Sequence, residues 1–176
     1  VHPGSDTFKT DELEKICKDL NVEYVVYNSD LAKIVFDIRQ EKNPCSLCAK
    51  MRKGSLNELA KANGCNKVAY AHHKDDVVET MMMSLIYEGR FHTFSPVTYL
   101  DRMDLTVIRP MMYVREADVI GFANLYQLPV LKSPCPADGY TKRESTKDLL
   151  KQIDKDAPGV KERMFTAIED GIYHKP

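Results

Sequence analysis

The chain has 176 residues, of which 43% are hydrophobic and 29% are charged, and its formal net charge at pH 7 is −1. This length and composition argue for one folded domain and against a disordered chain. The near-neutral charge argues against a globally cationic surface, so any contact with nucleic acid must come from a local patch. No apolar run reaches the roughly 18 residues of a membrane helix, and no leader peptide is recognisable, so we expect a cytoplasmic protein.

Helical and strand patterns alternate along the chain. In chain order, the predicted elements are a helix (10–20), a strand (22–27), two helices (29–40 and 46–63), a strand (66–71), a helix (77–89), a hairpin or edge pair (94–100 with 105–111), a helix (115–127), a strand (128–133) and two helices (143–155 and 158–170). Strands that alternate with long helices predict an α/β fold in which helices flank a parallel sheet. Ligands of such folds bind at the carboxyl ends of the strands.

The segment AYAHHKDDVVET (69–80) reads as the end of a strand, a polar turn and the start of a helix. It would place His72, His73, Asp75 and Asp76 at the carboxyl end of that strand. Two interpretations are open. The carboxylates could cap the helix and complement its dipole, or they could hold Mg²⁺ on a nucleotide while a histidine contacts the phosphates or the base.

Cysteines form a second group of candidate site residues. Cys45 and Cys48 lie three positions apart in NPCSLCAKMRKG (43–54), and Cys135 lies between two prolines after a predicted strand. Three interpretations of these cysteines are open: a zinc site, a redox pair and an iron–sulfur cluster. A structural zinc site commonly uses two cysteine pairs of this spacing. Of the five cysteines, Cys17 and Cys65 are expected to be packed thiols.

Basic residues follow both cysteine segments. This local charge is typical either of a solvated face or of an RNA contact. The residues are Lys50, Arg52, Lys53, Lys142 and Arg143.

Three segments together resemble the PP-loop ATPases that thiolate tRNA, and most closely the tRNA 2-thiocytidine biosynthesis family. These are NPCSLCAK…IYEGR (43–90), VIRPMMYVREADV (107–119) and SPCPADGYTKR (133–143). The resemblance implies an adenine nucleotide α-hydrolase-like fold. It also implies that ATP adenylates a cytidine of the tRNA anticodon loop, after which sulfur replaces the activated oxygen.

The same resemblance assigns roles to the candidate residues. Cys45, Cys48 and Cys135 would hold a [4Fe–4S] cluster whose fourth iron is left open to carry sulfur, with zinc as the alternative metal. His72, His73, Asp75 and Asp76 would serve ATP and Mg²⁺. The basic residues Lys50, Arg52, Lys53, Lys142 and Arg143 would contact tRNA.

The beginning of the chain departs from the family pattern, because the SGGxDS loop that holds pyrophosphate is absent and HPGSDT (2–7) resembles only a degraded copy. We therefore expect a chain without its first βα unit, which would not bind ATP productively by itself. Its exposed sheet edge would favour a homodimer. Residues 1–150 are expected to form the PP-loop domain, and residues 151–176 a helical extension of it.

Three alternative functions stay open at this point. A related enzyme could form 2-thiouridine instead of 2-thiocytidine. The chain could also be a non-catalytic remnant that binds metal and RNA, or a thiol redox protein. The sulfur donor cannot be read from these motifs.

Overall fold

The computed structural model describes residues 10–40, 44–131, 135 and 139–174. The chain divides into two compact units. One unit is formed by residues 1–66 with 123–138, and the other by residues 67–122 with 139–176. The domain limit predicted at residue 150 falls inside helix α5 (Lys142–Asp156), and the division into residues 1–150 and 151–176 stays a prediction.

The first unit is helical in its described part. It contains α1 (Asp11–Asp19), the π-helical segment η1 (Lys33–Ile38) and α2 (Pro44–Ala62), which agree with the helices predicted near those positions. The strands predicted at 22–27 and 128–133 are wrong within the described residues. Residues 22–27 and 128–131 are not part of the sheet, and Val25, Tyr27 and Val130 are exposed. A strand needs a hydrogen-bonded neighbour, and a β-branched sequence alone does not supply one.

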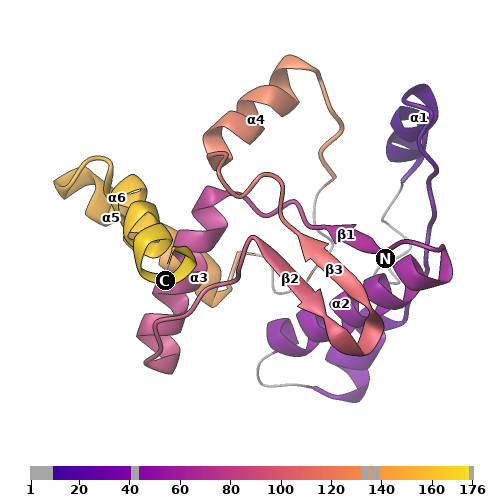
Figure 1. The fold of residues 1–176 in the computed structure, drawn as a ribbon, viewed down its shortest axis with the longest axis horizontal. Coiled ribbons are helices and arrows are strands. Elements are labelled where there is room, and N and C mark those ends of the chain that lie inside the picture. Colours follow the sequence, from indigo (N-terminus) through magenta and orange to yellow (C-terminus); the bar gives the residue numbers. More distant parts are fainter. Residues whose placement is uncertain (1–9, 41–43, 132–134, 136–138, 175–176) are drawn as a thin grey trace. The chain divides into compact units, whose positions relative to one another are not determined.

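The second unit contains a three-stranded mixed sheet of order β1-β3-β2 (Figure 1). Strand β1 (Lys67–Ala69) runs parallel to β3 (Leu105–Ile108), and β3 pairs antiparallel with β2 (Val97–Leu100). The predicted hairpin is therefore confirmed, with the short helix η2 (Asp101–Met103) at its turn. Alternate residues Leu105 and Val107 of β3 are buried, as one covered sheet face requires.

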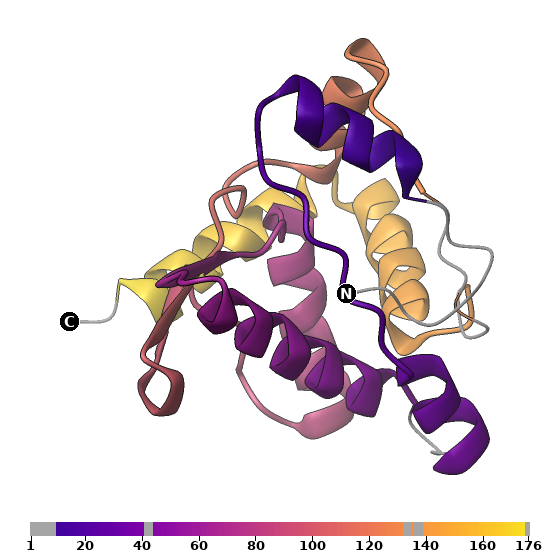
Figure 2. The same cartoon turned by 90° about the vertical axis from the view of Figure 1, so that its right-hand side faces the viewer.

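Helices supply the core of this unit. Helix α3 (Lys74–Glu88) packs against α5 and α6 (Val160–Ile168), which η3 (Glu169–Tyr173) extends, and the three helices lie together in both views (Figures 1 and 2). Helix α4 (Glu116–Leu125) follows β3, has no buried residue, and belongs to this unit up to Phe122. The buried core cluster consists of Val77, Val78, Met81, Met112, Leu150, Phe165 and Ile168. No helix in the described part of the chain is long and apolar enough to cross a bilayer.

Candidate functional site

The HHKDD turn lies where the sequence predicts it, between the carboxyl end of β1 and the start of α3. His73 is the N-cap residue of α3, and its Nδ1 accepts a hydrogen bond from the backbone N–H of Asp76 at 3.4 Å. The backbone N–H of His73 donates in return to Asp76 Oδ2 at 3.0 Å. This reciprocal capping box satisfies two N–H groups at the helix start and fixes the turn. The capping interpretation of Asp76 is therefore correct in geometry.

Asp75 is buried and anchors the turn to two other elements. Its Oδ2 accepts from the backbone N–H of Glu116 at 2.7 Å, and its Oδ1 pairs with Lys161 Nζ at 2.8 Å. Burial alone would raise the pKa of Asp75. The hydrogen bonds from Lys161 and from the Glu116 backbone outweigh burial, so the pKa lies below its ordinary value. Asp75 is therefore an ionised carboxylate at neutral pH.

Glu79, one turn further along α3, is the most deeply buried carboxylate of the site and is only 1% exposed. Its Oε2 accepts from Arg143 at 2.8 Å, and its Oε1 lies 3.7 Å from Lys147 Nζ. Burial raises the pKa of Glu79 above its ordinary value, against the opposing effect of Arg143 and Lys147. Asp75 and Glu79 thus share a helix but have pKa values displaced in opposite directions.

Arg143 joins these carboxylates. Besides Glu79, it donates to Asp76 Oδ1 at 3.2 Å and to Thr80 Oγ1 at 3.2 Å. The sequence predicts Arg143 as an RNA contact, and the structure shows that its guanidinium is already engaged within the protein. Lys142 is exposed, and its Nζ lies 4.4 Å from the ring centroid of Tyr87.

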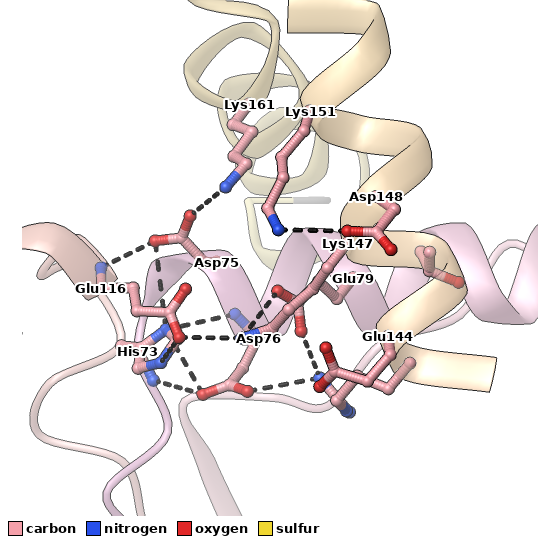
Figure 3. Close-up of polar contacts among 12 residues, drawn as sticks. His73, Asp75, Asp76, Glu79, Glu116, Glu144, Lys147, Asp148, Lys151 and Lys161 are labelled. Atoms are coloured by element: carbon pink, nitrogen blue, oxygen red, sulfur yellow. Dashed lines mark hydrogen bonds and ion pairs between the residues drawn. The ribbon is translucent and has the colours of Figure 1, made fainter. Parts of the chain in front are cut away.

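The polar network extends to α4 and α6 (Figure 3). Lys147 pairs with Glu116 Oε1 at 2.8 Å, and the same oxygen lies 3.7 Å from His73 Nε2. The sequence analysis does not single out Glu79, Glu116, Lys147 or Lys161. Nothing in the local sequence marks Glu116, Lys147 and Lys161, because they lie 31 to 86 positions from their partners.

His72 belongs to an aromatic cluster at the carboxyl ends of β1 and β3. Its ring lies 4.6 Å from Phe94 and 5.5 Å from Tyr70, which follows β1. Arg109, which follows β3, places its guanidinium 4.9 Å from the Phe94 ring, and burial lowers the pKa of Arg109. His72, His73, Asp75 and Asp76 thus lie together at the strand ends, the edge where α/β folds bind ligands.

The three candidate cysteine ligands lie in one compact unit although Cys135 is 87 positions from Cys48. Cys45 is exposed and Cys48 is half-buried in the first turns of α2, where residues three apart face the same side; Cys135 is also half-buried. Thiols are suitable donors for iron–sulfur clusters and zinc. However, no three His, Cys, Asp or Glu side chains are assembled for a metal ion among the described residues.

Outside this trio, Cys17 is half-buried, as expected, but Cys65 is exposed. The prediction of a packed thiol is wrong for Cys65. Gly64, with φ of +70°, follows the end of α2 and directly precedes Cys65. On α2, Lys50, Arg52 and Lys53 are exposed, as an RNA contact would require.

Comparison with known proteins identifies the family. A model of the PP-loop domain matches residues 4–147. The chain belongs to the PP-loop domain family. This result confirms the resemblance and the fold class that the sequence predicts. The expected copy of the pyrophosphate loop, HPGSDT (2–7), lies outside the described residues.

Several relatives of this PP-loop chain are known. It is 36% identical to tRNA-cytidine(32) 2-sulfurtransferase of Aliivibrio fischeri over 91% of this chain and 53% of that protein. It is 37% identical to the Shewanella baltica protein of the same name, over 86% of this chain and 49% of the relative. The chain thus spans about half the length of the curated relatives it matches.

A solved structure gives the same result for the fold. The U34-tRNA thiolase NcsA from Methanococcus maripaludis, determined with its [4Fe–4S] cluster, superposes with a TM-score of 0.76 at 26% sequence identity. The match covers 99% of this chain and 60% of the thiolase. The mixed sheet and its flanking helices are therefore a PP-loop arrangement.

Proposed function

We propose that this chain is part of an ATP-dependent tRNA sulfurtransferase that thiolates a cytidine of the anticodon loop. One observation carries the proposal: a PP-loop chain has a capped HHKDD turn at the strand ends of its second unit and three free cysteines, Cys45, Cys48 and Cys135, in its first unit. The relatives named for this reaction on cytidine support the choice of base. A tRNA substrate would place the protein in the cytoplasm.

The HHKDD turn is assigned to the nucleotide. His72 and His73 would contact ATP, while Asp75 and Asp76 would hold Mg²⁺ through carboxylate oxygens, the ligands this ion prefers. Both carboxylates already have cationic partners, Lys161 on Asp75 and Arg143 on Asp76. Binding of Mg²⁺ would therefore replace a protein cation at one of these oxygens, and the released side chain would be available for a phosphate.

The three cysteines are assigned to a [4Fe–4S] cluster, with zinc as the alternative occupant. When bound, a cluster with three protein ligands supplies an iron position that is open to sulfur. Cys45 and Cys48 offer two thiols from one side of the positive end of α2, which favours anionic ligands. The cluster of the thiolase NcsA supports this assignment. The exposed Lys50, Arg52 and Lys53 that follow on α2 would guide the tRNA.

Anaerobic reconstitution with iron and sulfide, followed by iron, sulfide and zinc analysis, tests the cluster. We expect about four irons per wild-type chain and loss of most of this iron in Cys45→Ser, Cys48→Ser and Cys135→Ser. Cys17→Ser and Cys65→Ser are the matched controls and should keep the wild-type content. Stoichiometric zinc without iron would contradict the cluster. A thiol redox protein would instead lose disulfide exchange in Cys45→Ser and keep it in Cys135→Ser.

A uridine-modifying enzyme is the second candidate, and the similarity to a U34-tRNA thiolase favours it. Mass spectrometry of tRNA nucleosides from a strain that lacks the gene distinguishes the two, because 2-thiocytidine disappears in one case and 2-thiouridine in the other. A non-catalytic remnant would change neither nucleoside. It would still bind metal and RNA.

A further inference from the structure

The surface where α3 ends and α5 begins carries two exposed tyrosines beside a lysine. Tyr140 is 92% exposed just before α5, and Tyr87 is 44% exposed in the last turn of α3. Lys142 Nζ lies 4.4 Å from the ring centroid of Tyr87, a cation–π contact that joins the two helix ends. Tyr87, Tyr140 and Lys142 belong to one compact unit, and we name them the tyrosine–lysine surface.

Stability does not explain the exposed ring of Tyr140. A tyrosine stabilises a fold through the ring area that it buries, and the ring of Tyr140 is almost entirely in water. Single exposed apolar residues are common and need no explanation. Here a second exposed ring and an ammonium group accompany the first, which is the composition of a binding surface.

The chemistry of the tyrosine–lysine surface fits single-stranded nucleic acid. Bases stack on aromatic rings, and an ammonium group pairs with the phosphates between them. A base within a duplex hides both of its faces against its neighbours, so the partner must contain unpaired bases. The nearby acid Glu88 does not oppose phosphate strongly, because Arg90 pairs with it at 2.8 Å.

We propose that Tyr87, Tyr140 and Lys142 bind an RNA loop by stacking its unpaired bases. This inference rests on the proposed function, which supplies RNA as the partner. The sequence position agrees with it, since Tyr140 follows Cys135 by five residues and lies two residues before Lys142. The tyrosine–lysine surface extends the expected RNA contact beyond charge to base stacking.

Fluorescence anisotropy with the full chain tests the proposal, using a labelled anticodon stem–loop RNA and a fully paired duplex of the same length. We expect Tyr140→Ala and Tyr87→Ala to weaken binding of the stem–loop by about fivefold or more. Tyr140→Phe should bind like the wild type, because stacking needs the ring and not the hydroxyl. Lys142→Gln should reduce the slope of log K against log salt by about 0.7.

Tyr99→Ala is the matched control. Tyr99 is also exposed, but it lies on β2 and its hydroxyl donates to Asp104 at 2.9 Å, so an acid faces the approaching phosphates. Its removal should leave RNA binding unchanged. Circular dichroism should show native helix content in every variant, since none of the substituted rings belongs to the core.

The outcomes separate this inference from the proposed function. If the wild-type chain does not bind the stem–loop, the RNA partner and the tyrosine–lysine surface both fail. If the wild type binds it and the tyrosine variants bind equally well, the stacking surface alone is wrong. Equal losses for the stem–loop and the duplex would also overturn it, because stacking requires unpaired bases.

Discussion

Asp75 and Glu79 show how the surroundings of two carboxylates on one helix can displace their pKa values in opposite directions. Both are buried, and burial by itself raises the pKa of a carboxyl group. At Asp75 two hydrogen-bond donors, Lys161 and the Glu116 backbone, reverse this effect. At Glu79 burial prevails over Arg143 and Lys147. Of these two carboxylates, Asp75 is therefore the one whose surroundings favour the ionised form that suits a cation ligand.

The opposite pKa displacements predict opposite pH dependences of stability. Because the pKa of Glu79 is raised in the folded protein, protonation of Glu79 stabilises the fold. This contribution is fully present at pH values below the pKa of the unfolded chain, near 4.5, and is lost as the pH rises through the folded pKa. Because the pKa of Asp75 is lowered in the folded protein, ionisation of Asp75 stabilises the fold. This contribution is fully present at pH values above the pKa of the unfolded chain, near 3.8, and is lost as the pH falls through the folded pKa.

Urea unfolding from acid to neutral pH measures both effects. Relative to the wild type, the free energy of unfolding of Glu79→Gln should increase as the pH rises above about 4.5. For Asp75→Asn the difference from the wild type should shrink as the pH falls below about 3.8. Curves for Glu79→Gln and the wild type that run parallel over the whole range would show that the burial of Glu79 has no energetic consequence.

At the scale of elements, α3 is the helix on which the site depends, and local chemistry fixes both of its ends. The His73–Asp76 capping box defines its start, and Gly89 ends it in the left-handed conformation with φ of +62°. The backbone N–H of Gly89 donates to the carbonyl of Ser84. These ends determine which residues of α3 face α5 and α6, and so where Glu79 lies.

Gly89→Ala should destabilise the second unit by about 1 kcal/mol or more, because a Cβ strains the left-handed backbone. Gly121→Ala in α4 is the matched control: no atom lies within 4 Å of the added Cβ, and φ is not positive. It should be neutral or stabilising, by up to about 1 kcal/mol. Thermal unfolding measures both variants. Equal shifts of the same sign would contradict the backbone argument.

For the whole molecule, RNA binding has to work against a net charge of −1. The exposed Lys50, Arg52 and Lys53 concentrate positive charge on one helix of the first unit, and the tyrosine–lysine surface lies in the second. In the described part of the chain β1 and β2 are the edge strands of the sheet. The homodimer that such edges favour stays a prediction, which size-exclusion chromatography can test.

Replacing Lys50, Arg52 and Lys53 together by glutamine should reduce the slope of log K against log salt by about 2, at roughly 0.7 per lost phosphate contact. The matched control is a triple variant at Lys15, Lys18 and Lys33, which are equally exposed in the same unit. It should keep the wild-type slope. Anisotropy titrations of the stem–loop RNA at several salt concentrations give both slopes. Equal losses would indicate nonspecific attraction.

The sequence by itself determined the features that depend on neighbouring residues. It located α2, α3, α5 and the β2–β3 hairpin, because periodicity, capping residues and turns act over a few positions. It also indicated the family, since the cysteine pair and the HHKDD turn lie in one nearly continuous block. The HHKDD residues could be placed at a strand end for the same reason.

Tertiary structure alone decided the features that depend on distant partners. Residues 22–27 have strand composition, but strand formation requires a paired neighbour that composition does not specify. Arg143 resembles a surface cation in the sequence, and only the packing of α5 on α3 brings it to Glu79. Lys161 reaches Asp75 across 86 positions for the same reason. Pairing and burial are set by the folded chain as a whole, so no local pattern could predict this network.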